Sequence, residues 1–330
     1  MAEPLTLALM TRFDAPSVEQ IRAVDPRIEV LDFGGPLFGA GPDEATKRDI
    51  LSRLAPAEVM VGNNRLPVEY FDAAANLRWF QAMNAGLERL DRAGVLQRGF
   101  AVTNGSGLAA PAIAEWCIAA MFALAKQFPA YVRNQDRHAW ERVRGGIALE
   151  GKTCGVVGLG AIGRETAKRA RALGMRVVAC RRTVDGDDPD CDALIPYSNL
   201  HELLAQSDFV VLCVPLTRET TNLIDAPALK AMKRTASILN IARGAVIDQA
   251  ALEVALRDGT IASAALDVTT PEPLPAESSL WALPNVLITP HSSGASDRRD
   301  GTALALLLEN LRRYLANEPL KNLARPELGY

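Results

Sequence analysis

The sequence predicts an α/β protein made of two doubly wound parallel sheets. Short apolar runs alternate with helical patterns along both halves of the chain, as in parallel strands covered by helices. The chain has 330 residues, enough for two domains of ~150 residues each. Apolar residues make up 48% and charged residues 23%, which is typical of a folded globular protein and excludes a disordered one.

The first half of the chain has the pattern of short parallel strands. We expect a helix over Pro16–Val24. Gly34–Pro42 is a loop that lacks the Gly-Lys-Ser/Thr ending of a phosphate loop, so we interpret it as a plain connection. Strands are predicted at Leu5–Met10, Ile28–Phe33, Glu58–Gly62 and Leu77–Ala82.

The second half alternates more regularly and predicts six strands of one sheet. These strands are expected at Thr153–Val157, Arg176–Ala179, Phe209–Val214, Ser237–Ile241, Ala262–Leu266 and Val286–Ile288. Helices are expected between them at Ile162–Leu173, Leu200–Ala205, Ala226–Ala231 and Gln249–Asp258. A long apolar helix, Leu108–Ala125, joins the two halves. The last helix, Asp297–Ala316, follows the completed second sheet, so we expect it to pack on the first domain.

Charge and residue usage exclude several classes of protein. The net charge is −3 and no run of basic residues occurs, which argues against nucleic-acid binding. Pro111 and Glu115 interrupt the apolar stretch at 108–125, so it is not expected to span a membrane. The first four residues lack the features of a secretory signal. Five widely spaced cysteines predict neither disulfides nor a metal site, and we expect a cytoplasmic protein: Cys117, Cys154, Cys180, Cys191 and Cys213.

A glycine motif marks a dinucleotide site. Gly158-Leu159-Gly160-Ala161-Ile162-Gly163 follows a predicted strand and opens a predicted helix. In this context Gly158 makes the tight turn, Gly160 lets the backbone approach a pyrophosphate, and Gly163 lets the helix pack closely on the strand. The helix N-terminus attracts the phosphate charge. The alternative is a glycine-rich turn that binds no ligand.

The end of the next strand indicates which cofactor is used. NAD enzymes usually carry an acidic residue there, about 20 residues after the glycines, to bind the ribose 2′-hydroxyl. Here the strand ends in Arg181-Arg182-Thr183, with no carboxylate at that position. Because arginine pairs bidentately with phosphate, the segment favours the 2′-phosphate of NADP, with NAD still possible. Two solvated surface arginines are the alternative.

Three later strands each end in a polar residue. Arg243 follows one strand, Asp267 and Glu272 follow the next, and His291 follows the last. Active sites of open α/β sheets lie at these carboxyl ends. Arginine, carboxylate and imidazole together suit hydride transfer to a carbonyl: the arginine fixes an anionic substrate, the imidazole supplies a proton, and the carboxylate raises the imidazole's basicity.

The other two histidines are poorer candidates for a proton donor. His138 lies in a polar stretch far from any predicted strand end, and His201 opens a short surface helix. His291 is therefore the best candidate. Taken singly, Arg243 and Glu272 could be ordinary solvated residues, and it is their ordered occurrence with the glycine loop that favours function.

Taken together, these motifs resemble the D-isomer-specific 2-hydroxyacid dehydrogenase family over nearly the whole chain. Further matching segments are Pro215-Leu216-Thr217 with Thr220, Trp79-Phe80-Gln81-Ala82-Met83-Asn84-Ala85-Gly86, Val102-Thr103-Asn104 and Ala114-Glu115-Trp116. The resemblance implies a Rossmann cofactor domain, residues 106–294, inserted in a flavodoxin-like substrate-binding domain, residues 1–105 and 295–330.

The resemblance also implies residue roles. Catalysis is implied for Arg243, Glu272 and His291, and Asp267 matches the aspartate that contacts the nicotinamide side. Substrate binding is implied for Arg243, His291 and the backbone of Asn84, Ala85 and Gly86. Cofactor contacts are implied for Gly158, Gly160, Ala161, Ile162, Gly163, Arg181, Arg182, Thr183, Val214, Pro215, Thr220, Ile241, Ala242, Asp267 and Gly294.

The activity implied is NADPH-dependent, reversible reduction of a small 2-oxo acid, of the glyoxylate or hydroxypyruvate type, to the D-2-hydroxy acid. The family's use of the long helix and the following arm implies a homodimer. The chain ends at Tyr330 without the regulatory domain of larger phosphoglycerate dehydrogenases, so serine control is not expected. Two alternatives stay open: an NAD(P)-sensing interaction protein of the corepressor type, and a related dehydrogenase acting on phosphite, formate or aryl 2-oxo acids.

Overall fold

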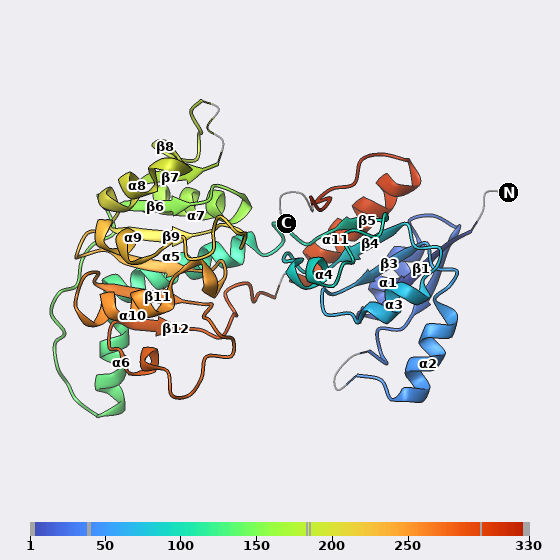
Figure 1. Cartoon of the computed structure of the whole chain (residues 1–330), viewed down its shortest axis with the longest axis horizontal. Coiled ribbons are helices and arrows are strands. Elements are labelled where there is room, and N and C mark those ends of the chain that lie inside the picture. The colour runs from blue at the N-terminus through green and yellow to red at the C-terminus, as the bar shows by residue number, and fades with distance from the viewer. Residues whose placement is uncertain (1–3, 38–40, 183, 185, 298, 326–330) are drawn as a thin grey trace. The chain divides into compact units, whose positions relative to one another are not determined.

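The chain forms two compact units, each built around a parallel sheet. The computed structural model describes residues 4–37, 41–182, 184, 186–297 and 299–325 (Figure 1). Unit 1 comprises residues 1–108 and 297–330, and unit 2 comprises residues 109–296. The boundaries drawn from the sequence, 105/106 and 294/295, lie three and two residues earlier in the chain.

Unit 1 contains a five-stranded parallel sheet with the order β2-β1-β3-β4-β5. This 2-1-3-4-5 order is that of the flavodoxin-like fold. Its strands are β1 (Leu5–Leu9), β2 (Ile28–Asp32), β3 (Val59–Gly62), β4 (Trp79–Ala82) and β5 (Ala101–Thr103). Its helices are α1 (Ala15–Arg22), α2 (Glu44–Arg53), α3 (Val68–Ala73), α4 (Glu88–Arg92) and α11 (Arg299–Leu315). The sequence prediction lacked β5, because three residues are too few for a detectable pattern.

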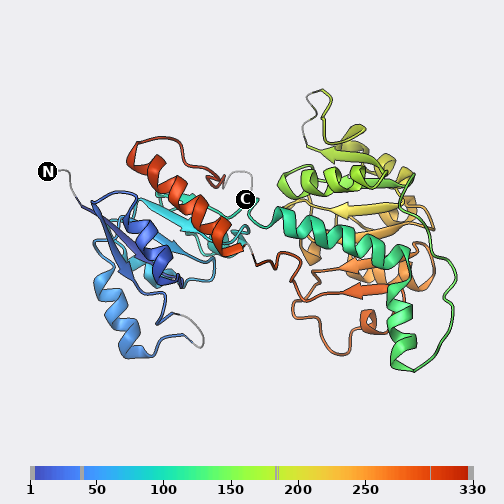
Figure 2. The same ribbon diagram turned by 180° about the vertical axis from the view of Figure 1, so that it is seen from behind.

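The last helix packs on the sheet of unit 1, as the sequence predicts. Helix α11 lies against the sheet of unit 1 in both views (Figures 1 and 2). Its Leu307 and Leu311 are fully buried in one cluster with residues of β1, β3 and β4. The ring of Tyr314 stacks on the indole of Trp79 at a centroid distance of 5.4 Å. The second hydrophobic cluster of this unit lies among β1, β3, β4, α2, α3 and α4. Helices thus cover both faces, so the central strands β3 and β4 are buried throughout, whereas the edge strand β2 buries only Ile28.

Unit 2 contains a seven-stranded parallel sheet with the order β12-β11-β10-β9-β6-β7-β8. From β6 onward this is the doubly wound 3-2-1-4-5-6 order of the Rossmann fold, with one strand more. Its strands are β6 (Thr153–Val157), β7 (Arg176–Arg181), β8 (Ala193–Pro196), β9 (Phe209–Leu212), β10 (Ser237–Asn240), β11 (Ser263–Leu266) and β12 (Val286–Ile288). The expected fold class is therefore confirmed for both units.

The prediction of six strands in unit 2 was wrong by one. The additional strand, β8, pairs with β7 at the sheet edge, where Arg181 is opposite Pro196. It has four residues and only Ile195 among them is buried. A short, half-exposed edge strand that ends in proline has no apolar run to detect.

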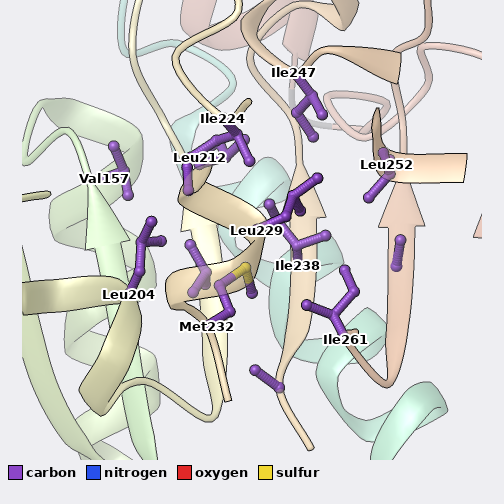
Figure 3. Packing of buried hydrophobic residues seen from close by; sticks show 14 of the residues in the cluster. Val157, Leu204, Leu212, Ile224, Leu229, Met232, Ile238, Ile247, Leu252 and Ile261 are labelled. Carbon is purple, nitrogen blue, oxygen red and sulfur yellow. The ribbon is translucent and has the colours of Figure 1, made fainter. Parts of the chain in front are cut away.

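Helices cover both faces of the unit 2 sheet. On one face pack α8 (Leu200–Gln206), α9 (Ala226–Ala231) and α10 (Gln249–Arg257), with Leu204, Leu229 and Leu252 in the buried cluster shown in Figure 3. On the other face pack α5 (Ala110–Ala125) and α7 (Ala161–Ala172), as Figure 2 shows. After α5 follow α6 (Phe128–Asp136) and an arm without regular structure at 137–148. In the described part of the chain, no helix meets the length and apolarity needed to cross a membrane.

Candidate active site

The glycine loop joins β6 to α7, and each of its three glycines has a different environment. Gly158 has φ +99°, and a Cβ there would lie 2.9 Å from the carbonyl oxygen of Cys213. At Gly163, a Cβ would lie 2.1 Å from the carbonyl oxygen of Gly158. Both positions therefore require glycine. A Cβ on Gly160, the N-cap residue of α7, would meet no atom within 4 Å.

This loop fits a pyrophosphate. The open space at Gly160 lies at the N-terminus of a 12-residue helix, where unpaired N–H groups and the helix dipole favour an anion. The role of Gly160 at the pyrophosphate stays a prediction. Ala161, Ile162 and Gly163 form the first turn of α7.

The carboxyl end of β7 carries two arginines, and each has a carboxylate beside it. Arg181 Nη1 lies 3.5 Å from Asp188, and Arg182 Nη2 lies 3.3 Å from Glu219. Asp188 is buried and accepts two hydrogen bonds of 2.8 Å from Arg164 of α7. These hydrogen bonds hold the pKa of the Asp188 carboxyl below its usual value. Thr183, the third residue of the predicted set, lies outside the described residues.

The loop after β9 borders the glycine loop, because β9 pairs with β6 in the sheet. Val214 is buried, and its Cγ1 would lie 2.9 Å from a Cβ on Gly158. The hydroxyl of Thr220 donates to the carbonyl of Pro215 at 2.6 Å and accepts the N–H of Thr217 at 2.7 Å. Thr220 therefore closes this loop, and the predicted cofactor residues Val214 and Pro215 are held in place by it.

Arg243 follows β10 and is positioned by a buried asparagine. Asn240, the last residue of β10, donates to the carbonyl of Arg243 at 3.0 Å and accepts the N–H of Ala242 at 3.1 Å. The guanidinium of Arg243 donates to the carbonyl of Ala242 at 2.7 Å. A Cβ on Gly244 would lie 2.0 Å from the carbonyl oxygen of Thr269, so the loop after β10 lies directly against the loop after β11.

Asp267, which follows β11, organises the loop that carries His291. Its carboxylate is 2% exposed and accepts the N–H groups of Ser292 at 2.8 Å and Ser293 at 3.0 Å. It also accepts the hydroxyl of Thr289 at 2.6 Å, while its backbone carbonyl accepts the N–H of His291 at 2.8 Å. A buried carboxylate with this many donors is satisfied without a counter-ion. The structure thus gives Asp267 a local structural role; the implied nicotinamide contact stays a prediction.

The imidazole of His291 faces the carboxylate of Glu272. His291 Nδ1 lies 2.9 Å from Glu272 Oε2, and Oε1 of Glu272 accepts the N–H of Thr269 at 3.3 Å. With a carboxylate as its partner, Nδ1 carries the proton, so Nε2 is the nitrogen that can exchange one. His291 has φ +52°, a left-handed conformation that a non-glycine residue adopts only when its surroundings enforce it. The hydrogen bonds to Asp267 enforce it here.

Arg243, Glu272 and His291 come from loops that follow three neighbouring strands, β10, β11 and β12. The ends of parallel strands meet at one edge of a sheet, which places the three side chains on the edge that carries the glycine loop. Ile241 and Ala242 are buried in the loop after β10. Gly294 packs on the start of α5, where a Cβ would lie 3.2 Å from the Cβ of Ala109.

In unit 1, the Asn84–Gly86 segment follows β4, and neighbouring residues bind all of its carbonyl groups. The carbonyls of Asn84, Ala85 and Gly86 accept hydrogen bonds of 2.8, 2.9 and 2.7 Å from Gly105, Asn104 and Asn64. Within the described residues, the N–H groups of the three form no hydrogen bond. Consecutive unpaired N–H groups form a concave site that suits an anion.

Comparison with known proteins identifies the family. The model for the NAD-binding domain of D-isomer specific 2-hydroxyacid dehydrogenases matches residues 118–293. This chain belongs to the D-isomer-specific 2-hydroxyacid dehydrogenase family. It is an NAD(P)-dependent dehydrogenase, and the resemblance stated from the sequence is confirmed.

Full-length similarity extends over both units of the dehydrogenase. This chain is 35% identical over 295 residues to a glyoxylate reductase of Korarchaeum cryptofilum, and the match covers 87% of this chain and 89% of that protein. It is 33% identical over 285 residues to a glycerate dehydrogenase of Methylorubrum extorquens, covering 83% and 88%. A family member from Xanthobacter autotrophicus, solved in complex with NADPH and MES, superposes with a TM-score of 0.81 at 30% identity over the full length of both chains.

Sequence reasoning missed two groups of residues that shape this dehydrogenase site. Asn240 and Asp188 hold the Arg243 and Arg181 segments, and Thr289, Ser292 and Ser293 connect the His291 loop to Asp267. A polar residue closing the apolar strand Ser237–Asn240 was a detectable signal for Asn240. Asp188 gave no signal, because its contact with Arg181 depends on how the intervening loop folds back.

Proposed function

We propose that this dehydrogenase reduces a small 2-oxo acid, of the glyoxylate or hydroxypyruvate type, to the D-2-hydroxy acid with NADPH. The observation that carries the proposal is the His291–Glu272 pair at 2.9 Å, on the sheet edge that also bears Arg243 and the glycine loop. The names of two relatives, glyoxylate reductase and glycerate dehydrogenase, support a substrate of two or three carbons.

The proposed chemistry divides the work among three side chains. Arg243 binds the anionic carboxylate of the substrate through its planar fork of donors. Protonated His291 donates its Nε2 proton to the oxygen at C2, while Glu272 on Nδ1 orients the ring and balances its charge. When bound, the reduced nicotinamide supplies the hydride that C2 receives. One hydride and one proton convert the C=O group to CH–OH, and the reverse reaction returns the proton to His291.

Unit 1 is proposed to bind the substrate carboxylate through the Asn84–Gly86 segment. Its three N–H groups form no hydrogen bond within the described residues, while its carbonyls are all occupied by Asn64, Asn104 and Gly105. A backbone site of this kind recognises a carboxylate without regard to the rest of the molecule. It therefore suits a family of small 2-oxo acids.

The preference for NADPH is proposed from the arginines at the end of β7. Asp188 forms an ion pair with Arg181, but both of its carboxylate oxygens accept hydrogen bonds from Arg164. It is therefore not available to a ribose 2′-hydroxyl, the interaction that selects NAD. Arg181 and Arg182 supply the charge that a 2′-phosphate needs. The NADPH complex of the Xanthobacter relative supports the same choice.

The proposal is tested by following the loss of absorbance of NADPH and NADH with a panel of 2-oxo acids. We expect glyoxylate or hydroxypyruvate to give the highest kcat/KM, and NADPH to exceed NADH by ~10-fold or more. Arg181→Asp should erase or invert the cofactor preference and leave the choice of 2-oxo acid unchanged. Equal or higher kcat/KM with NADH would contradict the cofactor proposal, and activity confined to phosphite, formate or aryl 2-oxo acids would contradict the substrate proposal.

We also propose that the dehydrogenase is a homodimer. Helix α6 and the arm after it expose an unusual amount of apolar surface: Phe128 and Val132 are more than half exposed, and Trp140 is fully exposed. Several large apolar side chains exposed on one helix and the arm after it suggest an interface, and a second copy related by a two-fold axis is the simplest partner. Light scattering after gel filtration should give twice the mass of the chain, and Val132→Glu with Trp140→Ser should shift it toward the monomer.

A cytoplasmic location is proposed from the thiols. The five cysteines are free, and Cys117, Cys154 and Cys180 are buried among apolar residues. Unpaired thiols are typical of the reducing cytoplasm. Cell fractionation with an antibody against this chain tests the proposal.

A further inference from the structure

Two buried polar atoms of the described residues have no hydrogen-bond partner, and both lie at the same corner of unit 2. They are Nε of Arg181 and the hydroxyl of Tyr197. Arg181 is the last residue of β7, and Tyr197 directly follows β8. The two strands are neighbours, and Arg181 is opposite Pro196 in the ladder. Tyr197 therefore lies at the carboxyl ends of the strands, where the cofactor site is proposed.

A buried hydroxyl that lacks a hydrogen-bond partner destabilises the folded protein when no ligand is bound. Leaving such a group without a partner costs about 1–3 kcal/mol, and native structures have few of them. The ring of Tyr197 is well placed, since it packs against the apolar cluster formed with Cys180, Ile195 and Leu200. Phenylalanine would supply the same packing without the penalty. Packing in the apolar cluster therefore does not explain why this position carries a hydroxyl group.

The charges around the two unpaired atoms indicate which chemical group would satisfy them. The ionisable groups that interact with the Tyr197 phenol are Cys180, Arg182 and Glu219, and burial raises its pKa, so it remains a donor. Arg181 is held through Nη1 by Asp188, which leaves Nε as a free donor. The phenol and Nε of Arg181 are two donors beside the guanidinium of Arg182, and together they match an anion with several acceptor oxygens, such as a phosphate monoester.

Arg182 and Glu219, whose charges both act on the Tyr197 phenol, form an ion pair with each other. Both side chains are more than half exposed, at 53% and 73%, and their separation is 3.3 Å. Such a surface pair contributes little and opens readily. A phosphate can therefore compete with Glu219 for the guanidinium of Arg182.

We propose that Tyr197 determines cofactor specificity: its hydroxyl, with Nε of Arg181, donates a hydrogen bond to the 2′-phosphate of NADP(H), while Arg182 exchanges Glu219 for the same phosphate. This proposal rests on the proposed use of NADPH. The proposal adds Tyr197 to the residues predicted for the cofactor site. Tyr197 follows β8, a strand that the sequence pattern does not reveal. The proposal also explains both unpaired donors with one ligand group.

The test is direct binding, measured by calorimetry, of 2′,5′-ADP and 5′-AMP to the wild type and to Tyr197→Phe. These two probes share the adenosine 5′-phosphate and differ in the 2′-phosphate. We expect Tyr197→Phe to weaken binding of 2′,5′-ADP by about tenfold or more and to leave 5′-AMP unchanged, since a hydrogen bond to a charged group is lost. Without ligand, the variant should melt at the same temperature as the wild type or higher, because an unpaired hydroxyl has been removed.

A matched control is Tyr314→Phe in unit 1. The Tyr314 hydroxyl donates to Glu58 at 2.6 Å, so its removal should lower the melting temperature and leave both Kd values unchanged. Equal loss of both ligands in Tyr197→Phe, or no loss of either, would overturn the role of Tyr197 while the wild-type preference for 2′,5′-ADP stands. If the wild type itself does not prefer 2′,5′-ADP, the proposed NADPH preference fails and the Tyr197 proposal fails with it.

Discussion

Nδ1 of His291 and Oε2 of Glu272 lie 2.9 Å apart although the residues are 19 positions apart in the chain. Each partner has its own anchor: the N–H of His291 donates to Asp267, and the second carboxylate oxygen of Glu272 accepts the N–H of Thr269. The pair is thus held from two loops that follow adjacent strands. Backbone groups hold both His291 and Glu272. We therefore expect the orientation of the His291 ring to depend on its hydrogen bond with Glu272 more than on any apolar contact.

The first prediction concerns this pair. His291→Gln should lower kcat for 2-oxo acid reduction by ~10²-fold or more, because no group remains to donate the proton. Glu272→Gln keeps the shape and a hydrogen bond to the ring but loses the charge that balances the imidazolium. We therefore expect a smaller loss of kcat for Glu272→Gln than for His291→Gln.

Steady-state rates at neutral pH, together with titration of NADPH fluorescence, check this prediction. Binding of NADPH should stay near the wild-type value in both variants. His291→Gln retaining near-full kcat would remove the assignment of the proton donor. Glu272→Gln with the kcat of the wild type would leave Glu272 a loop residue only.

The second prediction concerns a buried polar network that joins β4, β5 and α11 in unit 1. The hydroxyl of Thr103 accepts the indole N–H of Trp79 at 2.8 Å and donates to Gln81 Oε1 at 2.8 Å. Gln81 Oε1 also accepts the Nδ2–H of Asn310 at 3.1 Å. Thr103→Val leaves the buried indole N–H unpaired, so we expect a loss of about 1–3 kcal/mol in the free energy of unfolding.

Urea unfolding followed by tryptophan fluorescence measures this loss. Thr221→Val is the control, because its exposed hydroxyl donates only to the carbonyl of Thr217, and the change there should stay within about 0.5 kcal/mol. Equal effects of the two substitutions would mean that the Thr103 network adds nothing to stability.

The sequence predicted those features that local pattern determines. The glycine spacing at 158–163 predicted a strand, a turn and a helix, because each glycine meets a local backbone requirement that no other residue meets. The placement of Arg243, Glu272 and His291 at one sheet edge followed from the rule that strand ends carry sites in parallel sheets. Neither depends on distant contacts.

The features that the sequence did not predict depend on tertiary folding. Strand β8 is recognisable only by its pairing with β7, and Tyr197 has no sequence signal apart from that strand. The proximity of Asp188 to Arg181 arises because Arg164 of α7 binds the intervening loop. The pattern of residue types along the chain does not reveal such contacts, because each contact joins segments that share no periodicity.

The third prediction concerns pH and the buried thiols. Burial raises the pKa of Cys154 and of Cys180 to about 12, from the ordinary thiol value of 9.0. The folded state therefore keeps protons that the unfolded state loses, so stability falls as pH rises from about 9 toward about 12. Below pH 8 these thiols contribute no pH dependence.

Melting temperatures measured between pH 7 and pH 11 check this prediction. The wild type should lose stability above pH 9, and Cys154→Ala should lose it with a shallower slope, whatever its stability at pH 7. In the native protein at pH 8, Cys154 and Cys180 should not react with a disulfide reagent until urea unfolds the chain. Identical slopes for the two proteins would contradict the raised pKa.

The fourth prediction concerns the glycine loop and distinguishes cofactor binding at Gly160 from helix–strand packing at Gly163. A Cβ on Gly160 meets nothing within 4 Å, and φ is −85°, so Gly160→Ala should fold with stability within about 0.5 kcal/mol of the wild type. The same methyl group would occupy the space proposed for the pyrophosphate. We therefore expect Gly160→Ala to weaken NADPH binding by ~10-fold or more, measured by NADPH fluorescence.

Gly163→Ala should behave in the opposite way. Its Cβ would lie 2.1 Å from the carbonyl oxygen of Gly158, a backbone atom that cannot move without displacing β6 from α7. The expected loss of stability is at least about 1–3 kcal/mol, the range for overpacked sites, and thermal unfolding without ligand should reveal it. If Gly160→Ala instead bound NADPH as tightly as the wild type, the pyrophosphate would have to lie away from the N-terminus of α7. The open space at Gly160 would then be unrelated to the cofactor.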